Sequence, residues 1–426
     1  MAESTHTKIG VATATIIGMN AMIGSGIFTA PAAMASNVGP AGILAYIFVV
    51  VAVWFMALSL ARLAELYPQE GSFYIYAKPW SGHIGGLIAS GSYFAGLLIA
   101  MGALSQMAGF YLLDFFPTYS PYTLGLTALA LLIVLNMFGV VLSELGQHIL
   151  IVCTVFPLVA TTIACFSQIN LSNLVPFAPY GITNVLKATR IVIFGFFGFE
   201  CAASLFNIVK NPEKNVPRAL TYSIAIVGTI YTLFIASIIL STPASVFTGP
   251  HVRVSEIIRA LFPNSSLLAL TIHIAILSAI LGTVHSMIWT SSNLLTILVK
   301  RLKSNFGKRL VHSGLINQKT AVLIVGLCIS IAYATITNID LFFYLTAFFI
   351  IFCFIMSMIT LLTLKKEWQS KQNIKTVIGM LTAVLIFAFA IEGLVLELIK
   401  PAAQSTPLSV EIEEQREATQ DLTFPD

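Results

Sequence analysis

The sequence predicts an all-α polytopic membrane protein from its composition, from its recurring long apolar runs and from where its positive charges fall. The chain has 426 residues, of which 57% are hydrophobic and 9% are charged, whereas a soluble domain carries about 25% charged residues. A transmembrane helix needs roughly 20 apolar residues, and about eleven such stretches recur along this chain. They cover residues 10–34, 40–61, 83–112, 122–142, 148–166, 185–208, 219–241, 266–299, 320–336, 341–364 and 374–399.

Lysine and arginine are divided unevenly between the two sides of these spans. If the N-terminus, residues 1–9, is cytoplasmic, all but six of the 22 fall on the cytoplasmic side; the six are Lys187, Arg190, Arg253, Arg259, Lys400 and Arg416. Because cytoplasmic loops retain positive charge, we expect a multi-pass protein of the inner (plasma) membrane. Its net charge of +4 then reflects topology and gives no indication of nucleic-acid binding. The acidic tail, residues 401–426, is expected to be disordered and to lie outside.

The first span contains a predicted break. Gly24 and Gly26 flank Ser25, and glycine lets the backbone leave helical geometry without steric cost. Backbone groups freed inside a bilayer are tolerated only where they line a protein cavity. We therefore expect Met22, Ile23, Gly24, Ser25 and Gly26 to form part of a binding site. The alternative is that the glycines only allow a neighbouring helix to approach closely.

A second break is predicted in the sixth span, where Gly195 and Gly198 bracket Phe196 and Phe197. Interrupted spans at corresponding positions of two halves indicate a transporter binding site built on inverted repeats. The halves are residues 10–166 and 185–364, each with five helices, and a helix at 374–399 lies outside them. Phe194, Gly195 and Phe197 are the expected binding residues of this break.

Several other polar or aromatic residues lie inside predicted spans. An intramembrane carboxylate is functional by default, which makes Glu200 a candidate for gating or coupling. His285 and Trp289 are four residues apart and share one helix face. His285 is a candidate coupling residue, against the alternative of a hydrogen-bonded packing group. Arg190 is expected to extend its side chain to the interface, and Glu392 has no partner that the sequence reveals.

Three motifs, in this order, resemble those of a known family. They are Gly24-Ser-Gly-Ile-Phe28, Pro68-Gln-Glu-Gly-Ser-Phe-Tyr-Ile-Tyr-Ala77, and Gly198-Phe-Glu200 followed by Lys210-Asn-Pro-Glu-Lys-Asn-Val-Pro-Arg218. Over residues 8–365 the chain resembles the amino acid/polyamine/organocation transporter superfamily. Among its members it is most similar to the bacterial basic amino acid antiporters of the arginine/agmatine exchanger type.

This resemblance implies a leucine-transporter-type fold, in which helices one and six are broken and the substrate lies between helices one, three, six, eight and ten. It implies that Ser25 and Gly26 receive the substrate carboxylate, that Phe194 and Gly195 lie near its α-amino group, and that Trp289 lines the same pathway. Phe194 replaces a tryptophan of the arginine exchanger, which weakens stacking on a guanidinium. The family's twelfth helix is absent, so homo-oligomer formation stays open.

The leading hypothesis is a secondary transporter that moves an amino acid or its amine derivative by alternating access, as an exchanger. A proton-coupled symporter is the alternative, and the run 149–166 weakens it by offering only threonines as polar groups. A non-transporting amino acid receptor is a rival of another class. An enzyme is not expected, because no nucleophile–base pair or Walker-type loop is present. Neither a cofactor nor a metal is expected, since all five cysteines lie within spans.

Overall fold

The computed structural model places most of the chain in helices. It describes residues 8–24, 26–28, 34–35, 38–67, 72–138, 144–200, 209–243, 246–247, 254–303, 305, 309, 312–313, 317–336, 338–363 and 371–399. The first five long elements are α1 (Val11–Met22), α3 (Gly42–Leu66), α4 (Ser72–Leu112), α5 (Pro121–Met137) and α6 (Glu144–Phe166). The sixth predicted span holds three short pieces, α7 (Ile182–Lys187), α8 (Thr189–Val192) and the 3-10 helix η2 (Ile193–Phe196). The rest are η1 (Leu171–Leu174), α9 (Pro212–Ser241), α10 (Val254–Leu261), α11 (Ser266–Arg301), α13 (Gln318–Thr335), α14 (Ile339–Thr363) and α15 (Lys371–Ile399).

Within the described residues, seven helices are long and apolar enough to cross a membrane: α3, α4, α9, α11, α13, α14 and α15. Three shorter apolar helices, Val11–Met22, Pro121–Met137 and Ile151–Phe166, fall inside the predicted first, fourth and fifth spans. All ten coincide with apolar runs of the sequence, because a helix satisfies every backbone group within the segment itself. The total of eleven spans stays a prediction. The division of the chain into two five-helix repeats, residues 10–166 and 185–364, also stays a prediction.

Local sequence signals set several helix boundaries. Ser120 accepts a hydrogen bond from the Thr123 N–H at the start of α5, and Pro121 occupies the first helical position, where its missing N–H costs nothing. Asn317 forms a capping box with Thr320 at the start of α13. Within α4, Gly82 has φ 71° and ψ −167°, a conformation that favours glycine. The membrane helix therefore starts beyond Gly82, as the predicted span 83–112 has it.

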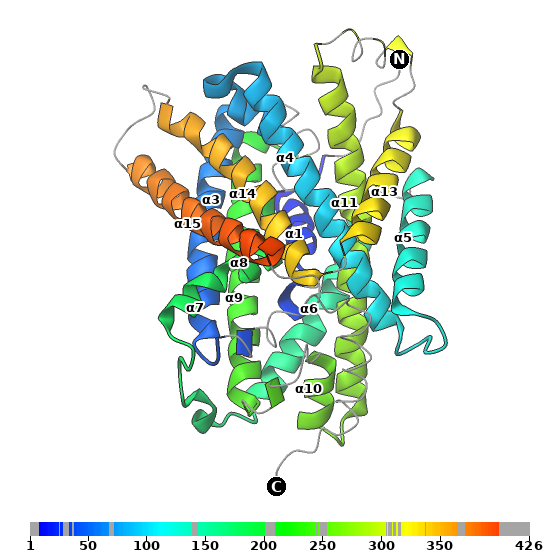
Figure 1. Cartoon of the computed structure of the whole chain (residues 1–426), viewed down its shortest axis with the longest axis vertical. Coiled ribbons are helices and arrows are strands. Elements are labelled where there is room, and N and C mark those ends of the chain that lie inside the picture. The colour runs from blue at the N-terminus through cyan, green and yellow to red at the C-terminus, as the bar shows by residue number, and fades with distance from the viewer. Residues whose placement is uncertain are drawn as a thin grey trace.

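The broken segments lie at the centre of the bundle. In Figure 1, α1 occupies the middle of the molecule, and it packs against α6, α9 and α11. The α8 helix packs against α3, α14 and α15. At one end, Ile9 and Val209 form a parallel bridge, in which the Lys210 N–H donates to the Ile9 carbonyl at 2.8 Å. The chain that enters α1 is thereby tied to the chain that leaves the second break.

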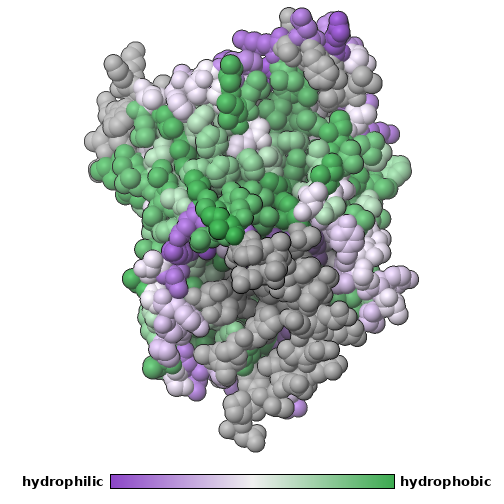
Figure 2. Space-filling model, in the orientation of Figure 1, coloured by the Kyte–Doolittle hydropathy of each residue, from purple (hydrophilic) through white to green (hydrophobic). Residues whose placement is uncertain are grey.

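The outer surface is predominantly apolar. Figure 2 shows hydrophobic side chains in a broad band across one face, with hydrophilic residues above and below it. Large apolar side chains such as Leu131, Phe156, Ile163 and Leu381 are exposed on α5, α6 and α15. Exposed apolar surface of this extent is uncommon on soluble monomers, and it is the surface that a lipid environment would cover.

Candidate functional site

The first break lies where the glycines predict it. The α1 helix ends at Met22, and Ile23 leaves helical geometry with φ −77° and ψ 83°. The Gly24 N–H donates to the Met22 carbonyl at 2.8 Å, which is a tighter turn than the α-helix makes. Helical geometry resumes at residues 26–28. Ser25, the predicted carboxylate ligand, lies outside the described residues.

Hydroxyl groups from two other helices donate hydrogen bonds to carbonyls at the end of α1, where the regular helical pattern stops. Thr283 of α11 donates to the Asn20 carbonyl at 3.2 Å and to the Ile23 carbonyl at 3.3 Å. Tyr231 of α9 donates to the Met22 carbonyl at 3.0 Å. A helix end inside a membrane needs such partners, because lipid offers none. Sequence reasoning missed both residues; the available signal was a hydroxyl in the middle of an apolar span.

The second break also lies at its predicted position. After α8 the chain tightens into the 3-10 helix η2, and Phe197 is extended with ψ 141°. Gly198 has φ 109°, in the region that side chains with a Cβ rarely adopt. Residues 201–208 lie outside the described part of the chain. The helical backbone of α8–η2 therefore ends at Phe196, two residues before Gly198.

The two breaks cross each other in direct backbone contact. A Cβ added to Gly26 would lie 2.6 Å from the Gly195 Cα and 3.0 Å from its nitrogen. A Cβ added to Gly198 would overlap the carbonyl of Ala21 and lie 3.1 Å from the Met22 nitrogen. Gly26 and Gly198 therefore allow two backbones to approach closely. This close packing is compatible with a binding site, because the crossing brings both sets of break residues together.

Gly24 has a different environment from Gly26. A Cβ there would meet the Thr283 side chain at 3.5 Å and Leu104 of α4 at 3.6 Å, which are ordinary contact distances. Gly24 therefore faces α4 and α11, whereas Gly26 faces the second break. The resemblance implies a pathway between helices one, three, six, eight and ten. Four of these meet at the first break, namely the two broken spans, α4 and α11.

Aromatic rings pack around the second break. Phe194 lies against Phe343 of α14, with ring centroids 4.6 Å apart, and Phe197 lies 6.4 Å from Phe354 of the same helix. Phe196 points to the other side, toward Tyr231 at 5.2 Å. All three phenylalanines are buried. Phe194 thus forms a ring contact between the sixth predicted span and α14, and its gating role stays a prediction.

Replacement of Phe194 by leucine should weaken substrate binding about 2- to 30-fold, because leucine offers no ring face to the amino or cationic group of a bound substrate, a contact worth about 0.5–2 kcal/mol. Leucine is preferred to alanine, since Phe194 is buried and a large cavity would destabilise the fold as well. Isothermal titration of the purified protein measures the effect. Phe352→Leu, which loses the ring contact of Phe352 with Phe387 away from the breaks, is the control. Equal affinities in the two variants would remove Phe194 from the site.

Glu200 is buried, with 1% of its surface exposed, and it bonds to the break in its own segment. The Gly198 N–H donates to Glu200 Oε2 at 3.0 Å. The Tyr93 hydroxyl of α4 and the Cys353 thiol of α14 lie close to the same carboxylate. Glu200 therefore connects the shape of the break to two helices that flank it, an arrangement compatible with the predicted gating role. Tyr93 was not anticipated from the sequence.

The structure places His285 against α5, on a different side of α11 from Thr283. The Nδ1 atom of His285 lies 2.9 Å from the Asn136 side-chain nitrogen of α5. At about 100° per residue, His285 lies about 160° and Trp289 about 120° around α11 from Thr283, the residue that bonds the first break. The hydrogen-bonded packing role of His285 matches this geometry. The coupling role of His285 and the pathway role of Trp289 stay predictions.

Comparison with known proteins identifies the family. Residues 9–410 match the family model described as amino acid permease. The chain belongs to the amino acid permease family. This family consists of transporters and not enzymes, in agreement with the expectation from the sequence. Together with the seven long apolar helices, it makes the chain a multi-pass membrane protein.

Individual relatives are about a quarter identical to this permease-family chain over the residues that align. The branched-chain amino acid permease BcaP of Bacillus subtilis is 23% identical over 62% of this chain and 61% of its own length. The γ-aminobutyric acid permease of the same organism is 26% identical over 67% and 64%. The cationic amino acid transporter 1 of Arabidopsis thaliana is 25% identical over 53% and 41%.

The alignments leave the substrate open. The chain spans little more than half the length of several of the curated relatives it matches, such as 53% of an uncharacterized transporter of Mycobacterium tuberculosis. The relatives named above differ in what their names say they carry, namely branched-chain amino acids, γ-aminobutyric acid and cationic amino acids. The comparisons therefore identify the family and no particular substrate.

Proposed function

We propose that the chain is a secondary transporter of the inner (plasma) membrane that moves an amino acid or its amine derivative by alternating access, as an exchanger. The observation that carries this proposal is the crossing of the two interrupted spans, with Gly26 against Gly195 and Gly198 against Ala21. Interrupted spans that meet inside a bundle supply unpaired backbone groups for a charged substrate. The N-terminus is cytoplasmic and the tail lies outside in this proposal.

Helix contacts support the two inverted repeats. We pair α1, α3, α4, α5 and α6 in order with α7–α8, α9, α11, α13 and α14. Four contacts between the halves then have counterparts: α1 with α9 and α8 with α3, α4 with α14 and α11 with α6, α4 with α13 and α11 with α5, and α6 with α9 and α14 with α3. A pattern that maps onto itself when every helix advances by five is expected of inverted repeats.

The residues around the breaks favour a substrate held by its carboxylate and amino groups. The atoms nearest Gly24 and Gly26 come from Thr283, Leu104, Gly195 and Phe194, none of which carries a charged side chain. Glu200, the charged group nearest the second break, bonds the backbone of Gly198. The start of a helix presents N–H groups that can receive a carboxylate, whereas the side chain of the substrate would meet leucine and aromatic surfaces. A cationic side chain could be received on the face of Phe194.

Exchange is proposed over proton symport because α6 offers no basic side chain among its described residues beyond the start of the helix. From Ile151 to Phe166 its polar side chains are Thr154, Thr161 and Thr162. His285, the other candidate for coupling, is bound to Asn136.

Counterflow in proteoliposomes tests the proposed function. Vesicles containing the full-length protein should accumulate labelled leucine, arginine or γ-aminobutyrate only when the same unlabelled compound is inside. Uptake into empty vesicles driven by an acidic exterior would instead support proton symport. Binding of a compound in detergent with no flux under either condition would support the receptor. Vesicles without protein provide the background.

A further inference from the structure

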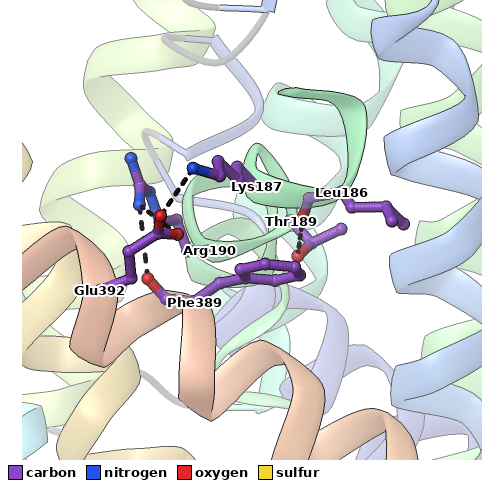
Figure 3. Close-up of polar contacts among 6 residues, drawn as sticks. All are labelled: Leu186, Lys187, Thr189, Arg190, Phe389 and Glu392. Carbon is purple, nitrogen blue, oxygen red and sulfur yellow. Dashed lines mark hydrogen bonds and ion pairs between the residues drawn. The ribbon is translucent and has the colours of Figure 1, made fainter. Parts of the chain in front are cut away.

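A cluster of charged residues joins α15 to the segment that leads into the second break. In Figure 3 the Glu392 carboxylate of α15 lies between Lys187 and Arg190. Lys187 Nζ is 2.6 Å from Glu392 Oε1, and the Arg190 terminal nitrogen Nη1 is 3.8 Å from Glu392 Oε2. Glu392 therefore has the partners that the sequence alone does not reveal, and Arg190 does more than extend to the interface.

The surroundings of Arg190 are shaped to hold its guanidinium. The group lies 4.6 Å from the centre of the Tyr344 ring of α14, and Nη1 is 3.4 Å from the Phe389 carbonyl of α15. A Cβ added to Gly393 would lie 3.0 Å from Nη1, so the absence of a side chain there leaves room for the cation. Arg190 thus contacts both α14 and α15, and it lies only four residues before Phe194 in the chain.

The cluster is not fully paired in this conformation. Arg190 Nε and Glu392 Oε2 are buried atoms without a hydrogen-bond partner among the described residues. An Arg–carboxylate pair is strongest when two guanidinium N–H groups donate to the two carboxylate oxygens. A small movement of α8 toward α15 would complete the Arg190 pair, and a movement away would break both pairs. A fixed structural ion pair would be expected to have its bonding atoms satisfied already.

We propose that Glu392 is a positioning residue of the transport cycle, which holds α7–α8 against α15 in this conformation and releases that segment when the path between the two breaks opens. The inference rests on the proposed function and adds a role for α15, a helix outside both proposed repeats. The effect is transmitted through the backbone, because α8 continues directly into η2, which carries Phe194 and Gly195. Any shift of α7–α8 is therefore transmitted to the crossing with Gly26.

Three variants in the full-length protein test the inference. Glu392→Gln removes the charge and keeps the shape. Glu397→Gln is the matched control on the same helix, since Glu397 lies five residues beyond Glu392 and accepts a hydrogen bond from the Asn338 side chain. Glu392→Asp retains the negative charge on a side chain that is one methylene group shorter, so it can still pair with Lys187 and Arg190. Thermal stability of each variant in detergent shows whether it is folded.

Counterflow of leucine, arginine and γ-aminobutyrate gives the first readout. Glu392→Gln should change the maximal exchange rate about 3- to 10-fold with KM altered by less than about twofold, because a positioning residue affects a conformational step. Glu397→Gln should match the unmodified protein, and the exchange rate of Glu392→Asp should lie closer to the unmodified rate than that of Glu392→Gln does. Equal rates in Glu392→Gln and Glu397→Gln would overturn the inference, as would a folded Glu392→Asp protein with the same rate as Glu392→Gln.

Hydrogen–deuterium exchange in detergent gives a second readout that does not depend on transport. Residues 182–199 should exchange at least about threefold faster in Glu392→Gln than in Glu397→Gln, because the segment opens more often once its tie is lost. Identical exchange would reject the role of Glu392 even if no compound were transported. Absence of counterflow in the unmodified protein, with the expected difference in hydrogen exchange, would reject the proposed function alone.

Discussion

Gly26→Ala is expected to abolish exchange and to destabilise the protein, although it adds only one methyl group. The added Cβ would lie 2.6 Å from the Gly195 Cα, and neither backbone can move aside as a flexible side chain could. Overpacking of this kind costs about 1–3 kcal/mol. It would also separate the two breaks, so that groups contributed by both could no longer reach one substrate. We expect exchange to fall below about one tenth of the unmodified rate.

The measurement combines counterflow with thermal unfolding in detergent. Gly91→Ala is the matched control, since a Cβ at that position of α4 meets nothing within 4 Å and alanine is the better helix former. Gly24→Ala should be milder than Gly26→Ala, because its Cβ would make only ordinary contacts with Thr283 and Leu104. Full activity in Gly26→Ala would show that the crossing of the breaks plays no part in function.

Glu200 provides the second large effect, and two substitutions separate its structural and electrostatic roles. Glu200→Ala removes the acceptor of the Gly198 N–H, and a buried unpaired donor costs about 1–3 kcal/mol. It should lower both thermal stability and exchange. Glu200→Gln retains a carbonyl oxygen that can accept the same bond, so its stability should remain near that of the unmodified protein.

Exchange should nevertheless slow several-fold in Glu200→Gln, because the charge beside Tyr93 and Cys353 is lost and the balance between conformations shifts by about 1 kcal/mol or more. Substrate affinity should be nearly unchanged. Isothermal titration and counterflow on the two variants measure these quantities. A loss of binding in Glu200→Gln as large as its loss of exchange would make Glu200 a direct substrate ligand and would contradict the gating role.

Much of the fold follows from local sequence properties. The apolar runs coincide with the long helices, because an apolar stretch of sufficient length has no other stable structure in a bilayer. The positions of both breaks are also local properties. Gly198 adopts φ 109°, and the residues around Gly24 leave helical geometry because glycine permits it. Even the start of the membrane helix beyond Gly82 follows from a positive φ at that glycine.

The contacts that make a site of these breaks depend on the tertiary structure. Tyr231 bonds a carbonyl 209 residues away, Thr283 one 263 residues away, and Lys187 a carboxylate 205 residues away. No spacing along the chain indicates such pairs, because helical periodicity identifies which residues share a face and not which helix that face meets. The sequence by itself determined where the chain spans and where it breaks. Packing of distant helices decided that the breaks cross, that His285 faces α5, and that Glu392 holds the segment leading to Phe194.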